Sequence, residues 1–229
     1  MMSYNPWPIG KIPKELRRPE LQTVKDLGYE FDDPREIVTI FEKKVAIYAG
    51  SKYAVSVDCC SHGIFLLLKY LKAKGTITIP KNSYISIPMQ ITFANCKYKF
   101  EDIEWKGSYQ LKPYPIWDSA MRWKKNMYSE GYHVCSFQIK KRKPIGRGGM
   151  ILTNDIDAYL WLKKSTYDGR DLNIKYDEDI IKEFGWHYYM TPEDAARGII
   201  LMDSIKHDEK DLGGHDNYPD LSKQIKNYE

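Results

Sequence analysis

The chain has 229 residues, of which 42% are hydrophobic and 14% aromatic, so it can bury a sizeable core. Its 35 basic and 31 acidic side chains give a net charge of +4, which is too modest to favour a nucleic-acid partner. The four cysteines contain no C-x-x-C pair and suggest no disulfide framework, which argues against zinc and favours a reducing compartment. The N-terminus lacks the apolar run of a signal peptide and no segment could cross a bilayer, so we expect a cytoplasmic protein without a membrane partner.

The first half of the chain alternates between predicted helices and strands. Residues 1–32 are rich in proline and charge, and we expect an N-terminal arm there. Asp33 can cap a helix that Gly50 ends. The following elements are predicted as strand, helix, strand, helix and strand at 52–58, 62–75, 76–80, 84–96 and 97–104. This order is typical of an α/β layer with parallel strands.

The second half continues the same pattern. Further strands are predicted at 113–118, 133–137 and 148–155, and the last is expected to run antiparallel to its neighbour because the connection is short. Helices are predicted at 155–169 and 191–210, the second capped by Thr191 with Pro192 in its first turn. We expect one domain at 33–210, followed by a loose polar tail at 211–229.

Residues suited to chemistry follow two of these strands, and open α/β sheets bind ligands at such strand ends. In DCCSHG, at 58–63, a strand passes into a helix whose exposed N–H groups, with the Ser61 hydroxyl, favour an anion. Ser61 is equally suited to an ordinary helix cap. Asp118 ends the strand PYPIWD, where its carboxylate could pair with a protonated ring nitrogen or cap a turn.

A third strand end leads into the segment SFQIKKRKPIGRGG. Here Ser136 and Lys141 stand five residues apart. A buried lysine at this place could capture a cofactor aldehyde with its amine. Four consecutive basic residues, 140–143, are also typical of a solvated loop, so the residues alone leave both interpretations open.

Taken in order, these segments resemble the DegT/StrS-type sugar aminotransferases, which are pyridoxal-phosphate (PLP) enzymes of the aspartate-aminotransferase fold. The segments that carry the likeness are FEKKVAIYAGSKYAVSVDCCSHGIFLLL, TITIPKNSYISIPMQITFANCKYKFEDIE, PIWDSA, SFQIKKRKPIGRGGMILTND, YDGRD and GWHYYMTPEDAARGI. They cover roughly residues 37–205. The resemblance implies an α/β fold, a three-layer sandwich with a mostly parallel sheet, like the large domain of that fold.

The resemblance also implies roles for single residues. Lys141 falls where the family's lysine forms a Schiff base with PLP, and Asp118 where an aspartate pairs with the pyridinium nitrogen. Tyr84 falls where an aromatic ring stacks on the cofactor. His187 falls where the family often has an asparagine that reaches the phosphate of the partner subunit. The other positions expected to hold the phosphate are Cys60, Ser61 and Ser136.

Several positions depart from the family's pattern. Cys60 replaces a glycine where the backbone approaches the phosphate, and Met121 replaces a glutamine that bonds the cofactor ring. Arg147 replaces an acidic residue in the Gly-rich turn, and Tyr189 an arginine. The added cations Arg142 and Arg147 either face a phosphorylated substrate, such as a nucleotide-sugar diphosphate, or belong to a solvated hairpin.

The resemblance implies a PLP-dependent aminotransferase that acts on a keto-sugar nucleotide, with glutamate or glutamine as the amino donor, in amino-sugar or surface-polysaccharide biosynthesis. The alternative is a non-catalytic binding or assembly module descended from the same fold. The chain stops where the family's small C-terminal domain would begin, so we expect that domain to be absent and a homodimer to complete the site.

Overall fold

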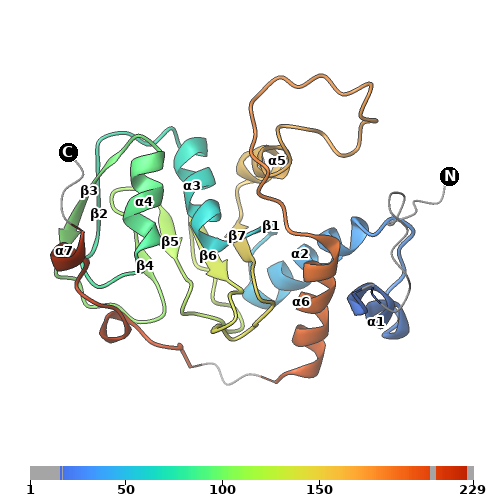
Figure 1. Ribbon diagram of the computed structural model, residues 1–229, viewed down its shortest axis with the longest axis horizontal. Coiled ribbons are helices and arrows are strands. Elements are labelled where there is room, and N and C mark those ends of the chain that lie inside the picture. Colours follow the sequence, from blue (N-terminus) through green and yellow to red (C-terminus); the bar gives the residue numbers. More distant parts are fainter. Residues whose placement is uncertain (1–15, 17, 207–209, 226–229) are drawn as a thin grey trace.

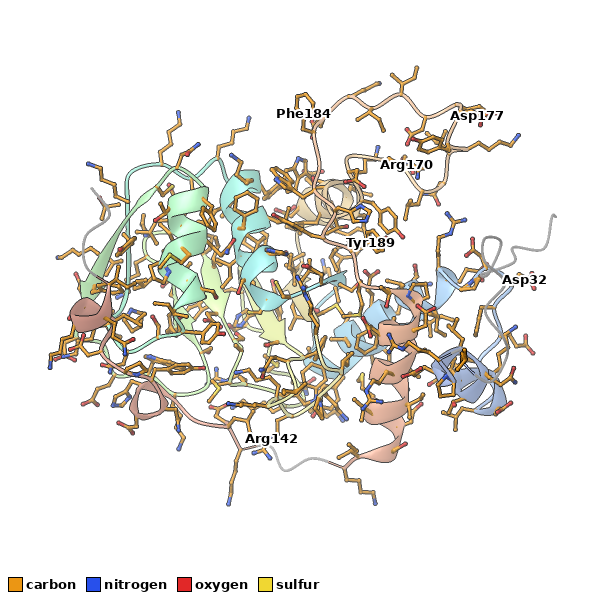
Figure 2. The ribbon with its side chains drawn as sticks, viewed as in Figure 1. Asp32, Arg142, Arg170, Asp177, Phe184 and Tyr189 are labelled. Atoms are coloured by element: carbon orange, nitrogen blue, oxygen red, sulfur yellow. The ribbon has the colours of Figure 1, made fainter. Side chains whose placement is uncertain are left out.

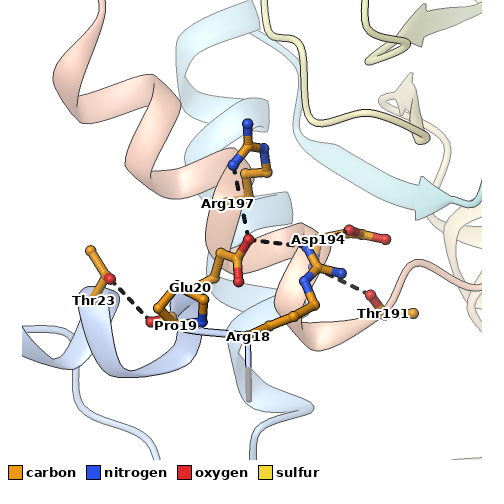
Figure 3. A network of polar contacts seen from close by, with 7 residues as sticks. All are labelled: Arg18, Pro19, Glu20, Thr23, Thr191, Asp194 and Arg197. Atoms are coloured by element: carbon orange, nitrogen blue, oxygen red, sulfur yellow. Dashed lines mark hydrogen bonds and ion pairs between the residues drawn. The ribbon is translucent and has the colours of Figure 1, made fainter. Parts of the chain in front are cut away.

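The computed structural model describes residue 16, residues 18–206 and residues 210–225 (Figure 1). Residues 1–15 and 17 of the predicted arm lie outside this part. The rest of the arm contains helix α1 (Glu20–Asp26), which packs along α6 (Pro192–Ser204). Ion pairs join this part of the arm to α6 (Figure 3). Arg18, just before α1, pairs with Asp194 at 3.0 Å, and Glu20 of α1 pairs with Arg197 at 3.9 Å.

The central sheet has five strands in the order β1 (Tyr53–Val57), β7 (Gly149–Thr153), β6 (Tyr132–Ser136), β5 (Ile116–Asp118) and β4 (Tyr109–Gln110). Only β5 and β6 pair in parallel, while the other three pairings are antiparallel. The expected mostly parallel sheet is therefore wrong, and this sheet is mixed. The reason is that β7 returns from β6 through a short hairpin and lies between β6 and β1, so that both of its pairings are antiparallel.

The predicted antiparallel pairing of β6 with β7 is confirmed, and Cys135 lies opposite Met150 in its register. Strands β2 (Thr76–Pro80) and β3 (Lys97–Glu101) form a separate parallel pair. A single bridge between Thr78 and Lys112 links this pair to the segment that follows β4.

Side chains of the central strands alternate between two buried cores, as a period of two residues requires. Val55 and Ile151 belong to one core, and Ala54 and Leu152 to the other. The first core also holds side chains of α3 (Cys60–Tyr70), α4 (Ser86–Phe93) and α5 (Ile156–Ser165). The second holds those of α2 (Glu36–Ala49) and α6. Helices therefore cover both faces of the central sheet in an α/β fold (Figure 1).

The helix ends follow the predicted signals in part. Thr191 caps α6 by accepting a hydrogen bond from the N–H of Asp194, as expected. Gly50 ends α2 in the left-handed region, with φ of 81°, also as expected. Asp33 is not the N-cap, because α2 begins at Glu36 and its N-cap is Arg35, which makes no side-chain cap hydrogen bond. The Asp33 carboxylate accepts from the N–H and the guanidinium of Arg35 just before the helix.

Residues 211–225 are not the loose tail that the sequence suggested. They form a short helical turn, η2 (His215–Asn217), and helix α7 (Leu221–Gln224), and they pack against the body. We call residues 211–224 the strap. The ordering comes from specific partners, since Arg122 bonds Asp211 and several strap amides bond backbone carbonyls of the body. Residues 226–229 lie outside the described part.

Residues 168–187, here called the projecting segment, leave the body after α5 and return before α6 (Figure 2). A bridge between Tyr167 and His187 closes its base. Gly169 and Gly185 pass so closely that an added Cβ on either would lie within 2.1 Å of the opposite backbone. Among the described residues, no helix combines the length and apolarity needed to span a membrane.

Candidate active site

A cavity of about 510 Å³ lies beside the carboxyl ends of β5 and β6 and the N-terminus of α3. Open α/β sheets bind ligands at this kind of place, because strand ends and helix N-termini meet there. Seven of the nine predicted site residues line it: Lys141, Asp118, Cys60, Ser61, Tyr84, Ser136 and Arg147.

Asp118 is the last residue of β5 and is only 5% exposed. Its carboxylate accepts hydrogen bonds from the Tyr109 hydroxyl at 2.7 Å and the Ala120 N–H at 3.0 Å. Burial raises the pKa of Asp118, although these bonds and the nearby Lys141 oppose the shift. A carboxylate desolvated in this way is stabilised by a positive charge in the same cavity, which is what a protonated ring nitrogen would provide.

Lys141 lies in the turn that follows β6 and is half-buried, whereas its neighbour Lys140 is exposed. Its Nζ donates toward the Met121 sulfur at 3.2 Å. Burial lowers the pKa of Lys141, although Asp118 and Cys60 oppose the shift. The basic run is therefore not uniformly solvated, and the amine at position 141 loses its proton more readily than that of a surface lysine.

The other end of the cavity is suited to an anion. The first turn of α3 supplies backbone N–H groups, which carry partial positive charge at a helix N-terminus. The Ser61 hydroxyl lies 2.6 Å from that of Ser86, and Ser136 lines the same space. The Arg147 guanidinium donates a 2.7 Å hydrogen bond to Asp58 and also lines the cavity. These groups together match a phosphate.

Cys60, which stands where the family has glycine, turns its sulfur toward the strand ends. Its Sγ lies 3.5 Å from the Val134 carbonyl oxygen and 3.9 Å from Asp118. Burial raises the pKa of Cys60 well above its ordinary value, so the group remains a neutral thiol. The added side chain is thus directed to the carboxylate end. The cavity combines a buried carboxylate, a half-buried amine and an anion-binding helix terminus, which are the kinds of group that would hold PLP.

Two predicted residues do not line the cavity. Arg142 donates instead to the carbonyl oxygen of Lys210 at 3.0 Å. His187 lies at the base of the projecting segment, where its ring bonds Asp168 at 2.8 Å. The structure therefore does not bring Arg142 into this cavity, because its side chain is directed to the chain that leads into the strap.

The structure adds residues that the sequence did not single out. Tyr109 bonds Asp118 from the neighbouring strand β4. Leu212, Asn217 and Tyr218 line the cavity from the strap. Tyr109 belongs to a strand of two residues, too short to leave a periodic pattern, and an aromatic residue in a polar tail was the sole sequence signal for Tyr218.

The fold and this cavity define an α/β domain of the kind found in PLP-dependent sugar aminotransferases. Residues 23–118 match the DegT/DnrJ/EryC1/StrS aminotransferase family, which confirms the resemblance seen in the sequence. No curated protein sequence matches the chain.

Solved structures share the fold at low sequence identity. The chain is similar to the sugar aminotransferase CalS13 from Micromonospora echinospora, with TM-score 0.65, 16% identity and coverage of 81% of this chain and 64% of that one. DesI, solved in the presence of its TDP-sugar product, matches with TM-score 0.62 and 17% identity over 81% and 57% of the two chains. PseC from Helicobacter pylori, an aminotransferase involved in the biosynthesis of pseudoaminic acid, matches with TM-score 0.64 and 14% identity over 82% and 62%. The chain thus spans less than two thirds of the length of these structures.

Proposed function

We propose that this protein is a PLP-dependent aminotransferase that transfers an amino group to a keto-sugar nucleotide, in amino-sugar or surface-polysaccharide biosynthesis. The observation that carries the proposal is that the Lys141 amine and the Asp118 carboxylate line one cavity with an anion-binding helix terminus. The similarity to a protein solved with a TDP-sugar product supports a nucleotide sugar as substrate. All four cysteines are free, which suits a cytoplasmic location.

Each end of the cavity would hold a different part of the cofactor. Lys141 would bind the aldehyde carbon, and Asp118 would pair with the ring nitrogen. The phosphate would contact the hydroxyls of Ser61 and Ser136 and the backbone N–H of Cys60. Arg147 would supply the positive charge that the phosphate requires, and its exposed position also suits the diphosphate of a nucleotide sugar.

When bound, PLP supplies an electron-poor ring that stabilises negative charge on the carbon next to the donor nitrogen. Lys141 would accept and return the proton of that carbon at Nζ, and its lowered pKa increases the fraction of neutral amine that can do so. Asp118 would hold the proton on the ring nitrogen, because a buried carboxylate favours a cationic partner. Glutamate or glutamine would be the amino donor.

We further propose a homodimer in which the projecting segment contacts the second copy. Phe184 in this segment is 94% exposed and Ile180 is 78% exposed, and Figure 2 shows Phe184 on the outer part of the segment, away from the sheet. Exposed apolar side chains of this size indicate an interaction surface. His187, which lies outside the cavity of its own chain, would then serve the partner's phosphate. Analytical ultracentrifugation should give a dimer for the native chain and a weaker one for Phe184→Asp.

The catalytic proposal is tested by cofactor capture. Protein incubated with PLP and reduced with borohydride should carry a phosphopyridoxyl group on Lys141, located by peptide mass spectrometry. Lys141→Ala should lose the modification, and Lys140→Ala should retain it at Lys141. Absence of specific modification in the native chain would overturn the proposal.

A second measurement separates an enzyme from the binding module considered above. Addition of glutamate to the PLP-loaded protein should release 2-oxoglutarate and shift the cofactor absorbance to that of the amine form. If Lys141 binds PLP but neither glutamate nor glutamine brings about this change, the protein holds the cofactor without turnover, and the non-catalytic alternative is supported.

A further inference from the structure

The strap forms part of the cavity lining and is bound to neighbouring segments of the body. Its residues Leu212, Asn217 and Tyr218 belong to the cavity lining, although 71 residues of sequence separate Lys141 from Leu212. The lining therefore combines the strand ends of the sheet with a chain segment that follows the last long helix. Like the loops that follow β5 and β6, the strap contributes to this lining from outside the central sheet and the helices packed on it (Figure 1).

An ion pair fastens one end of the strap. Arg122 donates two hydrogen bonds to Asp211, from Nε and from a terminal nitrogen, both at 3.0 Å. The two side chains are 23% and 10% exposed, so solvent screens this pair less than a surface pair. Gly107 lies so close that an added Cβ would stand 2.3 Å from the Asp211 carboxyl carbon. The geometry is bidentate, which is the strongest form of an arginine–carboxylate contact.

Backbone hydrogen bonds extend this attachment along the strap. The N–H of Leu212 donates to the Met121 carbonyl at 2.8 Å, and that of Leu221 donates to Lys81 at 2.9 Å. At Gly214, an added Cβ would stand 2.1 Å from the carbonyl oxygen of Trp105, so this position accepts only glycine. The strap is thus bound to the segment that follows β5 and to the one that follows β2.

Tyr218 is the aromatic residue that the strap contributes. Its ring stacks on Trp105, with centroids 5.7 Å apart and planes 29° apart, and meets Tyr84 edge-on at 6.3 Å. Its backbone carbonyl accepts a 2.9 Å hydrogen bond from the Asn82 side chain. Burial raises the pKa of Tyr218, with Asp118 nearby as a second cause, so its hydroxyl is neutral and near the carboxylate end of the cavity.

We propose that the strap forms a wall that closes the cavity over Cys60 and Asp118, with Asp211 as its latch and Tyr218 as the side chain that controls access. The closure itself does not depend on the bound cofactor. Its consequence for ligands does rest on the proposed function: a closed wall would slow the release of PLP and limit which substrates enter.

Access can be measured through the thiol of Cys60, which lines the cavity and is 9% exposed. The experiment uses a Cys59→Ser background, in which serine retains the helix cap and the adjacent thiol is absent. The rate at which N-ethylmaleimide modifies Cys60 is followed by mass spectrometry. Asp211→Asn and Arg122→Met should each increase this rate about tenfold, as expected for loss of a partly buried charged hydrogen bond.

Matched controls separate opening of the wall from unfolding. Cys96 is buried in the core and does not line the cavity, so its rate should not change in the latch variants. Lys223→Ala alters a strap residue whose side chain is 82% exposed, and the rate of Cys60 modification in this variant should equal that in the parent. Equal Cys60 rates in parent and latch variants would overturn the proposal. A parallel increase at Cys96 would also overturn it, because the strap would then be part of the global fold and not a separate wall.

Tyr218 gives a second, independent comparison. Tyr218→Ala should expose Cys60 to the reagent, whereas Tyr218→Phe, which retains the ring, should not. The modification rates are measured without cofactor, so they test the wall independently of the proposed enzyme. If Lys141 fails to bind PLP but the rate of Cys60 modification still depends on the strap, the aminotransferase proposal is refuted and the wall is supported. If Lys141 does bind PLP, its release from Asp211→Asn should be faster than from the parent, and equal release rates would show that the strap does not retain the cofactor.

Discussion

The Tyr109 hydroxyl donates a 2.7 Å hydrogen bond to Oδ2 of Asp118, and both side chains are buried. Among the described contacts of this carboxylate, the tyrosine supplies the shortest. It therefore stabilises the ionised form of a group whose pKa burial raises.

Tyr109→Phe should reduce the free energy of unfolding by about 1–3 kcal/mol at pH 8, because it leaves a buried carboxylate short of a donor. The loss should shrink toward acidic pH, since the variant raises the pKa of Asp118 further and a protonated carboxyl needs the donor less. Urea unfolding at several pH values measures this. Tyr176→Phe, at a side chain that is 78% exposed, is the matched control and should have no effect. A loss that does not vary with pH would contradict the assignment.

Arg147→Gln should weaken PLP binding roughly tenfold, because it removes the cation at the anion-binding end of the cavity. Pyridoxal, which lacks the phosphate, should bind the variant and the native chain equally. Absorbance titration with both ligands gives the comparison, with Lys97→Gln as a control at an exposed residue on β3. Equal weakening of the two ligands would place Arg147 elsewhere than at the phosphate.

Lys163→Met should destabilise the fold by about 3 kcal/mol, since it leaves the buried carboxylate of Glu42 without its charged partner. Glu42 is 3% exposed and accepts from Lys163 at 2.8 Å and from the Ser56 hydroxyl at 2.8 Å. The neighbouring Lys164 is 53% exposed in its side chain and pairs with Asp171, so Lys164→Met should cost less than about 1 kcal/mol. Urea unfolding of the two variants tests the contrast, and similar losses would refute it.

His133 should make the fold sensitive to acid. It is 2% exposed, and burial, with Arg122 as a second cause, lowers the pKa of His133 to about 4. The unfolded chain then binds more protons between pH 6.5 and pH 4, so stability is fully present above pH 6.5 and falls by about 2 kcal/mol on going to pH 5.

The acid sensitivity is measured as the difference in free energy of unfolding between pH 7 and pH 5. His133→Gln removes the titrating group, so the variant should lose less stability than the native chain over this interval. His187→Gln is the control, because His187 is exposed and its side chain lies outside the core. An identical pH dependence in the native chain and His133→Gln would show that other groups cause the effect.

Much of the fold follows from local pattern in the sequence. The alternation of helix and strand, the cap at Thr191 and the left-handed end at Gly50 depend on residues within one or two turns of each other. The antiparallel return of β7 follows from a short connection. The direction of the β1–β7 pairing was not predictable in this way, because it depends on which strand lies between two others and not on the strands themselves.

The candidate site was likewise predictable from the sequence only in part. Sequence order and the family resemblance together pointed to Lys141 and Asp118, and the two do line one cavity. The half-buried position of Lys141 beside an exposed Lys140 required the tertiary structure, because a run of basic residues does not reveal which side chain turns inward. Arg142, the next residue in the run, was expected to face a ligand, but its guanidinium bonds the carbonyl oxygen of Lys210 and does not line the cavity.

The amino-acid sequence by itself determined the α/β class and the strand ends where a ligand site belongs, because hydrophobic periodicity and caps are local properties. Only the tertiary structure decided that a polar stretch, the strap, packs beside that site. Its ordering comes from contacts such as Arg122 with Asp211, which are 89 residues apart, and a contact between distant residues leaves no local signal in either segment.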